Sequence, residues 1–458
     1  MQHQRLSLIK TLLLSCTIPW VSLAQVRYSV TEIPTLGGSE SVASGINSST
    51  QIVGNATITG DTARHAILWD NGTLTDLGTL GGNFSTANGI NSIAQVVGFS
   101  RYSTGSDNGH AFLWQNGHMT DLGTLGGPYS AAADINNSGK MVGYSSTPGD
   151  SFRHAFLWQG VDGTDLGVLG TGTNAIAYAI NNIDQIVGGS QTDGNLSTHV
   201  FLWQNGNMTD LNVPGSAYDI NNSTQIVGQS LNHAFLWQNG VLTDLLTLGG
   251  STSQAFDINN SGTVVGRAQT SGNVDHAFIW ENGVMTDLNT LIDSSSGWIL
   301  TVANCINDKG EIAGSGKHNG KSRGFLLRPA PRRPVLIIPG VGATYSADVS
   351  SDLTWLIHRG VPPSQLQIDP MTKVYHDLIQ TLKNVGYVEG KDLFRVNYDW
   401  RLPPGPDDGS IDGRVGGFTA SSISDSSYLY AVDYLGEILK QASVQWQTDH
   451  PGDTLDAV

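Results

Sequence analysis

The chain has 458 residues, of which 39% are hydrophobic and only 14% are charged, against about 25% charged in ordinary soluble domains. Its 23 basic and 39 acidic residues give a net charge of −16, and 56 residues are glycine. The acidic balance disfavours a nucleic-acid-binding protein, which needs a basic surface, and the scarcity of charge disfavours a coiled coil. The length predicts two or three domains.

Residues 1–24 have the pattern of a secretory signal peptide, with two basic residues, an apolar run and small residues before a cut between Ala24 and Gln25. We therefore expect a secreted, extracellular or periplasmic protein. A lipoprotein signal around Cys16 is the alternative. No later stretch has the roughly 18 to 20 apolar residues of a membrane helix, so we expect no transmembrane segment in the mature chain. After cleavage Cys305 is the only cysteine, which excludes an intrachain disulfide.

The sequence from residue 28 to residue 328 is repetitive. A segment of Ile-Asn, a short turn and Val/Ile-Val-Gly or a close variant occurs seven times, at spacings of 38 to 48 residues. These segments begin at Ile46, Ile90, Ile135, Ile180, Ile220, Ile258 and Ile306. Between them lie copies of His-Ala-Phe-Leu-Trp or a close variant, each followed by Thr-Asp-Leu with a constant His-to-Asp separation of 11. The pairs are His65 and Asp76, His110 and Asp121, His154 and Asp165, His199 and Asp210, His233 and Asp244, and His276 and Asp287.

Each repeat offers four short β-rich segments separated by turn residues, which is typical of a propeller blade. Asn-Gly pairs such as Asn71-Gly72 predict a two-residue hairpin turn that pairs Ile67 with Asp76. The fourth segment follows only six of the seven repeats, but a similar segment precedes the first one, at 28–38. We therefore predict a mainly β fold, a seven-bladed β-propeller over residues 25–328 whose last blade takes its outer strand from the N-terminus. Six or eight blades are the alternatives.

These motifs resemble the extracellular repeat family named after its His-Ala-Phe motif, over residues 28–328. The resemblance implies a secreted bacterial protein. The six His and Asp pairs could be metal ligands or general bases, but we expect them to brace the blades, as in WD-repeat blades, because catalytic groups are rarely needed sixfold. Asp134 to Gly139 is similar to the start of a calcium loop but lacks the bidentate acidic ligand, so a hairpin turn is the better interpretation. We expect no metal and no cofactor.

After Arg328 the composition changes, and residues 329–334 form a Pro-rich linker. Beyond it, over residues 335–458, the apolar run Val335 to Ile338 enters a Gly-rich loop and predicts a buried parallel strand. A helical stripe, a second strand from Leu393 to Trp400, a second helical stripe and a third strand from Thr454 follow. This β-α-β-α-β order predicts a parallel sheet with helices on its faces, an α/β domain.

Residues 333–340, the segment Tyr375 to Tyr387 and the motif Tyr398 to Leu402 resemble the N-terminal part of lecithin:cholesterol acyltransferase and related α/β-hydrolase lipases. The resemblance covers residues 333–458. It implies an oxyanion hole in the Pro-Gly loop, where Val341 and Gly342 are the candidates. Asp399, Trp400 and Arg401 belong to the family's substrate-loop motif. They could orient the substrate, but an ion pair between the carboxylate and the guanidinium that fixes the end of the strand is the expected role.

The family's nucleophile is the Ser of a Gly-x-Ser-x-Gly elbow after the next strand, and the chain as given ends at Val458, before it. We therefore expect a truncated α/β-hydrolase domain without nucleophile, acid or histidine, inactive as given. His358, His376 and His450 then have no nucleophile to activate. One Gly-x-Ser-x-Gly occurs around Ser322, but within the last repeat, and we expect it to be coincidental.

Two functions follow from the sequence. The first is a secreted lipase or acyltransferase that acts on lipid esters and whose propeller binds a surface or partner. The second is a non-catalytic extracellular protein that binds a cell-surface ligand or partner through the propeller. In both, the expected partner is a lipid ester or a cell-surface ligand, and not a nucleic acid.

Overall fold

The computed structural model describes residues 28–330, except 105–107, 150–151 and 196, and short pieces of the later chain. These pieces are residues 335–337, 344–346, 366–368, 379–380, 382–383, 387–390, 393–395, 438, 441–445 and 447–448. The chain separates into two compact units, and the division falls between Ala330 and Pro331.

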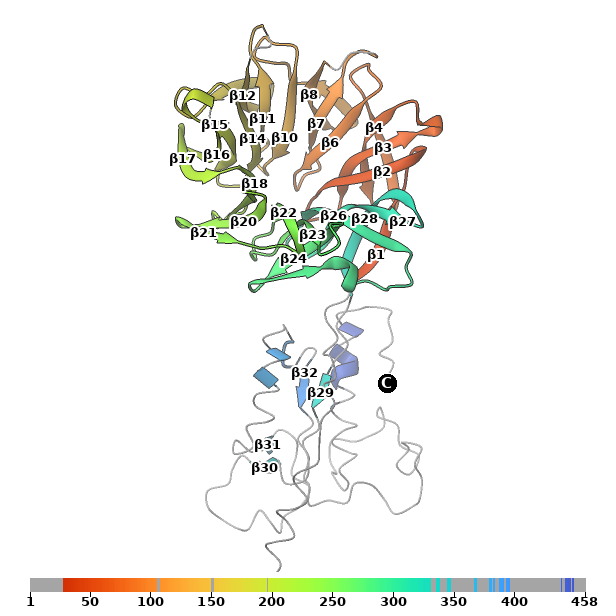
Figure 1. Ribbon diagram of the computed structural model, residues 1–458. Helices are drawn as coiled ribbons and strands as arrows, with labels where there is room; N and C mark the ends of the chain where they lie inside the picture. The colour runs from red at the N-terminus through yellow and green to blue at the C-terminus, as the bar shows by residue number, and fades with distance from the viewer. Residues whose placement is uncertain are drawn as a thin grey trace, which may run out of the picture. The chain divides into compact units, whose positions relative to one another are not determined.

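The first unit is a ring of seven four-stranded antiparallel sheets (Figure 1). Six sheets are built from four consecutive strands each. The seventh has the order β1-β28-β27-β26, so the first strand of the chain completes the last sheet. The seven-bladed β-propeller predicted from the repeats is therefore confirmed, and six and eight blades are excluded.

The blades share one strand order from the channel outward. The innermost strands are β2 (Gly37–Ile46), β6 (Ser85–Ile90), β10 (Ser130–Ile135), β14 (Ala175–Ile180), β18 (Ser216–Ile220), β22 (Gly249–Ile258) and β26 (Trp298–Ile306). The second strands are β3 (Ile52–Ile58), β7 (Val96–Arg101), β11 (Lys140–Ser146), β15 (Ile186–Gln191), β19 (Ile226–Ser230), β23 (Val264–Thr270) and β27 (Ile312–His318).

The third strands carry the His-Ala-Phe motif. They are β4 (Arg64–Asp70), β8 (Gly109–Gln115), β12 (Arg153–Gln159), β16 (Thr198–Gln204), β20 (His233–Gln238), β24 (Asp275–Glu281) and β28 (Lys321–Pro329). The outer strands are β5 (Thr73–Gly78), β9 (His118–Asp121), β13 (Asp162–Gly167), β17 (Asn207–Pro214), β21 (Val241–Asp244), β25 (Val284–Asp287) and β1 (Tyr28–Ile33). Three single-turn 3-10 helices, η1 (Thr59–Asp61), η2 (Asp193–Asn195) and η3 (Leu288–Thr290), lie in the connections.

The repeated motif is apolar on both faces because each blade packs between two others. In β8, Ala111 and Phe112 point to opposite faces of the sheet and both are fully buried. One core cluster joins Val53 and Leu68 of the first blade to Ala87 and Phe112 of the second. The predicted pairing of Ile67 with Asp76 is also present, across the turn formed by Asn71 and Gly72, both at positive φ.

A β-bulge interrupts every innermost strand one residue after its buried Ala. At each bulge the register with the second strand skips one residue, as between Ala87 and Gly89 of β6. The glycine of Val-Gly lies opposite and needs to be glycine, since a Cβ on Gly98 would be 2.0 Å from the carbonyl oxygen of Thr86. This close approach explains why Val-Gly recurs in the repeats.

The asparagine of each Ile-Asn segment joins its blade to the next blade. Its side-chain Nδ2 donates a hydrogen bond to the main-chain oxygen of the equivalent asparagine, at 3.0 to 3.2 Å, in all seven blades. The seventh bond, from Asn307 to Asn47, closes the circle. The members of this asparagine ring are Asn47, Asn91, Asn136, Asn181, Asn221, Asn259 and Asn307, all buried.

The second unit is described only in part. β29 (Val335–Ile337) pairs in parallel with β32 (Leu393–Arg395), and β30 (Thr344–Ser346) pairs antiparallel with β31 (Leu366–Ile368). Residues 379–380 and 382–383 are helical, and Ile379 and Leu382 pack on Leu393. The parallel pair joins two segments that the sequence predicts to be parallel strands. The predicted third strand lies outside the described residues.

We expect the substitution Asn181→Ala to destabilise the propeller by about 3 kcal/mol, because it leaves several buried groups without partners. The side chain is 4% exposed and donates to Asn221 O (3.0 Å) and Gln185 Oε1 (2.7 Å), and it accepts from the amide of Gln185 (2.9 Å). Urea unfolding of the full chain measures the loss. Asn207→Ala, at an exposed position, is the control, and equal stability of the two variants would contradict a structural role of the ring.

Candidate functional site: the propeller channel

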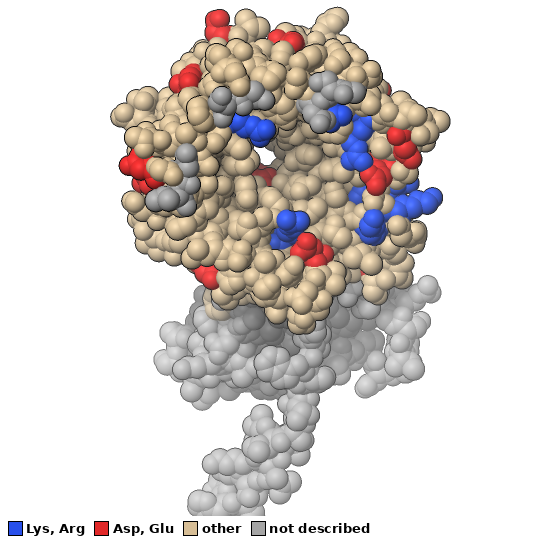
Figure 2. Space-filling view, turned by 45° about the horizontal axis from the view of Figure 1, so that its top comes forward, with Lys and Arg blue, Asp and Glu red and all other residues tan. Residues whose placement is uncertain are grey.

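The innermost strands surround a central cavity of about 970 Å³ that is open to solvent. Figure 2 looks onto one face of the ring and shows the opening at its centre, with basic side chains beside it. The volume lies at the upper end of the range of about 300 to 1,000 Å³ for small-molecule pockets. All seven blades contribute to the lining.

The residue at each β-bulge lines this cavity. These seven bulge residues differ from blade to blade, whereas the asparagine three positions later is always the same. Three adjacent blades have aromatic bulge residues and the other four have small or polar ones. In blade order, the bulge residues are Ser44, Asn88, Ala133, Tyr178, Tyr218, Phe256 and Asn304.

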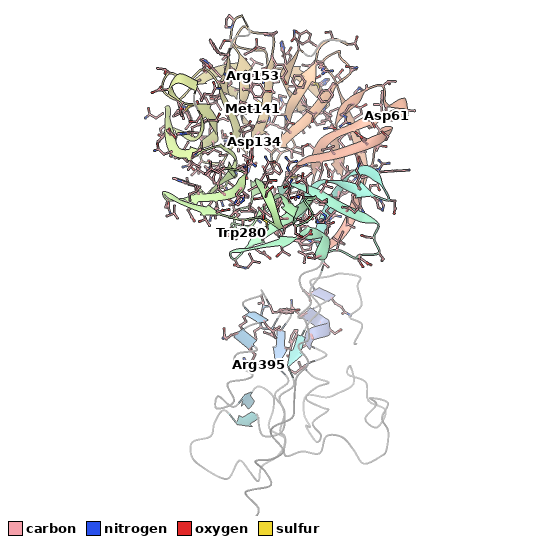
Figure 3. All side chains as sticks on the ribbon, viewed as in Figure 1. Asp61, Asp134, Met141, Arg153, Trp280 and Arg395 are labelled. Carbon is pink, nitrogen blue, oxygen red and sulfur yellow. The ribbon has the colours of Figure 1, made fainter. Side chains whose placement is uncertain are left out.

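Three carboxyl groups also line the channel, each one residue after a bulge (Figure 3 shows Asp134 toward the centre of the ring). Asp134 accepts the amides of Ile135 (2.7 Å) and, from the next blade, Ile180 (2.9 Å). Burial raises the pKa of Asp134 to about 6. Desolvation also raises the pKa of Asp219 well above its ordinary value, and the second cause is the neighbouring Asp257.

Asp219 and Asp257 hydrogen-bond to each other through their carboxyl groups. A hydrogen bond between two carboxyl groups requires that one of them carries the donated proton. Asp257 also accepts the amide of Ile306 at 2.7 Å. Burial and the closeness of the two groups therefore disfavour the state in which both carboxyl groups are ionised.

Arginine side chains cover aromatic rings around the channel. The guanidinium of Arg101 lies 5.3 Å from the ring of Phe84, and Arg267 lies 5.9 Å from Phe256. Arg153 lies 5.4 Å from the rings of both Tyr129 and Tyr144. Such cation–π contacts hold the guanidinium groups of these arginines in place.

Every predicted His and Asp pair is in contact. The Nδ1 atom of each His lies between 2.6 and 2.9 Å from the nearest carboxylate oxygen of its Asp. Each Asp also accepts the amide two residues later, as Asp76 does from Gly78 at 2.8 Å. Within the described residues, no three His, Cys, Asp or Glu side chains are grouped so that they could hold a metal ion.

The closing blade replaces this pair with a different one. Arg323 occupies the position of the His, and Glu32 of β1 occupies that of the Asp, opposite Phe325. Arg323 Nε lies 2.8 Å from the carboxylate of Glu32, which also contacts His318. A guanidinium cannot act as a general base or bind a metal. The closing blade therefore retains the ionic contact of the other blades but not a residue suited to catalysis or metal binding.

The other sequence candidates are not brought to the channel. Ser322 lies near the start of β28 and its hydroxyl accepts a hydrogen bond from Lys317 Nζ at 2.7 Å. A strand and not a helix follows it, so the Gly-x-Ser-x-Gly sequence around it lacks the geometry of a nucleophile elbow. Val341, Gly342, Asp399, Trp400, Arg401, His358, His376 and His450 lie outside the described residues.

One expectation about the channel needs correction. Asn136 to Gly139 form the predicted hairpin turn, in which the Gly139 amide donates to Asn136 O. Asp134 does not belong to that turn. It lies on β10, where the bulge directs it into the channel. The sequence signal that was missed is the variation between Gly, Ala, Asp and Cys at this position of the repeat.

Two family models match parts of the chain. Residues 170–330 match the family described as "Protein of unknown function (DUF3466)". Residues 363–409 match the family described as "Lecithin:cholesterol acyltransferase". The first match covers the last four blades, and the second covers a short part of the second unit. No family of His-Ala-Phe repeats is among the matches, and no curated protein matches the chain.

Solved structures with a similar fold share little sequence with the chain. TolB from Acinetobacter baumannii is 11% identical with a TM-score of 0.36, over 61% of this chain and 65% of that one. A puromycin-hydrolyzing peptidase of Mycobacterium tuberculosis is 10% identical with a TM-score of 0.40, over 64% and 53%. XC5397, a gluconolactonase from Xanthomonas campestris, is 12% identical with a TM-score of 0.34, over 68% and 94%. The chain spans slightly less than two thirds of TolB.

These likenesses are too weak to carry an argument about function. Across the described part of the chain, no helix is long and apolar enough to cross a membrane.

We expect the effect of Asp134→Ala on stability to depend on pH. A pKa of about 6 in the folded state, above the ordinary 3.8, means that Asp134 stabilises the fold most below pH 4 and that this contribution is lost as the pH rises through 6. The difference corresponds to at most about 3 kcal/mol. The variant should therefore gain stability relative to the wild type between pH 4 and pH 8.

Urea unfolding at several pH values measures this change. Asp162→Ala, which removes an exposed carboxylate from β13, controls for the loss of one negative charge. A stability difference between Asp134→Ala and the wild type that is constant over this range would contradict a raised pKa.

Proposed function

We propose that the chain is a secreted protein whose propeller binds a small ligand in its central channel. The observation that carries this proposal is the contrast between positions within the seven repeats. Positions that build the ring, such as the asparagine and the glycine of Val-Gly, are the same in all blades. The bulge residues, which face the cavity, differ. A channel that served only to close the ring would give no reason for an aromatic wall on one side.

The lining also has the composition of a binding site. It combines aromatic and aliphatic side chains with a few fixed polar groups, which is the usual make-up of ligand pockets. The amides of Asn88 and Asn304 are held by hydrogen bonds to main-chain oxygens at 2.8 and 2.7 Å. Asp134 is held by two main-chain amides. These polar groups are thus positioned before any ligand arrives.

We expect Ala133→Trp to block the channel without disturbing the fold. Position 133 is a bulge, and equivalent bulges accommodate Tyr178, Tyr218 and Phe256, so the frame accepts a large side chain there. In a thermal-shift screen of chemically diverse small molecules, compounds that stabilise the wild type should have no effect on the variant, whose own melting temperature should be unchanged. Binding that persists in Ala133→Trp would place the site elsewhere.

The pairs of His and Asp have a structural role in this proposal. We infer that they brace the outer two strands of each blade, because each carboxylate bonds both the His and a main-chain amide. The Arg323 and Glu32 pair of the closing blade supports this view, since it keeps the contact with other residue types.

Secretion and an acyl-transfer domain complete the proposal. The signal-peptide pattern of residues 1–24 and the resemblance to the extracellular His-Ala-Phe repeats support export. The match of residues 363–409 supports a second unit similar to lecithin:cholesterol acyltransferase, with a lipid ester as the substrate class. In that unit Val341 and Gly342 would form the oxyanion hole, and Asp399, Trp400 and Arg401 the substrate-loop motif. The parallel pairing of β29 with β32 is compatible with such a domain.

Expression of the full chain in a bacterial host tests both parts. We expect mass spectrometry of the exported protein to find Gln25 as the first residue, and a product that retains residues 1–24 would contradict cleavage. Hydrolysis of short-chain esters by this material, if present, should be the same in Ser322→Ala, because Ser322 bonds Lys317 and has no histidine partner among the described residues. Loss of turnover in that variant would make Ser322 the nucleophile.

A further inference from the structure

The aromatic bulge residues form one continuous wall of the channel. The rings of Tyr178 and Tyr218 are 5.3 Å apart at 81°, and those of Tyr218 and Phe256 are 5.7 Å apart at 39°. The three residues belong to three adjacent blades, so the wall extends along the channel's circumference. Among the described residues, none is a hydrogen-bond partner of the Tyr178 or Tyr218 hydroxyl. The wall therefore offers apolar ring surface with two hydroxyl groups.

The bulge residues on the opposite side of the channel are polar and carry fixed acceptors. Asn304, Ser44 and Asn88 are the bulge residues of three consecutive blades there. The side-chain Nδ2 atoms of Asn88 and Asn304 donate hydrogen bonds to main-chain oxygens. The Oδ1 atom of each side chain is not used in that bond and can accept another. The carboxyl groups of Asp134 and Asp257 add further acceptors. A ligand in the channel meets the wall of aromatic bulge residues on one side and polar bulge residues on the other, where Phe84 and Phe99 also line the cavity.

The charges of the channel favour neither a cation nor an anion. Arg101 lines the cavity, and Arg153 and Arg267 cover rings that line it, so a cation is repelled there. The carboxyl groups that line the channel repel an anion. Asp219 and Asp257 are close enough to hydrogen-bond to each other, which disfavours the ionisation of both. Neutral hydroxyl donors can bond to these carboxyl groups without bringing a charge.

A pyranose ring has the matching chemistry, with an apolar face of C–H groups and an edge of hydroxyl groups that donate hydrogen bonds. We propose that the channel binds a neutral saccharide, one ring of which stacks on the wall of Tyr178, Tyr218 and Phe256. This rests on the proposed ligand-binding role of the channel and specifies its ligand class. The cavity of about 970 Å³ has room for more than one sugar ring.

Calorimetric titration of the full chain with defined trisaccharides tests this proposal. The neutral probes are maltotriose, cellotriose, mannotriose, galactotriose and the trimer of N-acetylglucosamine. The charged probes are the trimers of glucosamine and of galacturonic acid. We expect at least one neutral probe to bind more tightly than either charged probe.

Variants assign the binding to the aromatic wall. Tyr218→Ala should weaken the bound neutral probe by at least about tenfold, because stacking is lost, and Tyr218→Phe should weaken it less. The fold should tolerate Tyr218→Ala, since other blades have Ser or Ala at the bulge, and an unchanged melting temperature checks this. Tyr102→Ala removes an exposed tyrosine that does not line the cavity and should have no effect.

The outcomes separate the ligand class from the site. If a charged trimer binds best and Ala133→Trp abolishes its binding, the channel is a ligand site but the saccharide is not neutral. The proposal of a neutral saccharide then fails, while the proposal of a ligand site in the channel stands. If a neutral probe binds equally to the wild type, Tyr218→Ala and Ala133→Trp, the channel is not the site and both proposals fail. If no probe binds, the proposal of a saccharide ligand is overturned.

Discussion

The propeller depends on a closed circuit of hydrogen bonds between seven asparagines, each from a side chain to the main chain of the next. Each amide nitrogen bonds to the main chain of the next blade, while the Oδ1 atom of the same residue holds its own turn, as in the two bonds from Ser49 and Gln51 to Asn47. A local turn and an inter-blade contact therefore rely on one buried side chain. Because the circuit returns to its first member, it fixes the rotation between neighbouring blades and with it the number of blades.

This circuit separates the residues that build the ring from those that face its lumen. The bulge lies three positions before the asparagine, and the extra residue there is unpaired. The size of its side chain therefore has little effect on the pairing of the sheet. The ring can therefore hold Ala133 in one blade and Tyr218 in another without a change of architecture. The same freedom applies to the next position, where Gly89, Asp134 and Cys305 occupy equivalent places.

Much of the fold could be predicted from the sequence, because the relevant signals are local and repeated. The alternation of apolar residues, the Asn-Gly turns and the offset of the fourth segment led to seven blades closed by β1. The pairing of His65 with Asp76 follows from a two-residue turn. The bulges were not predicted, because they appear only in the pairing of an innermost strand with the second strand, as between Ala87 and Gly89.

The asparagine circuit and the buried carboxyl groups were missed for another physical reason. An asparagine in a turn is well explained by bonds within the turn, and nothing local indicates a partner about 40 residues away. Asp134 stands beside such a turn, so its neighbours in sequence suggest a turn residue. Its neighbours in space, Ile180 and Asp219, belong to other blades. Only the ring as a whole brings them together.

The closing blade has a consequence for how the protein reaches this structure. Ser29 and Arg328 bond across 299 positions of sequence, whereas the strands within the other six blades pair with their immediate successors. Loop-closure entropy makes such distant pairing slow compared with hairpins. We infer that six blades can assemble in the order of synthesis. The edge of β28 in the seventh blade stays unpaired until β1 reaches it. That edge accepts the first strand of any copy of the chain, so at high concentration slow ring closure would favour strand exchange between molecules.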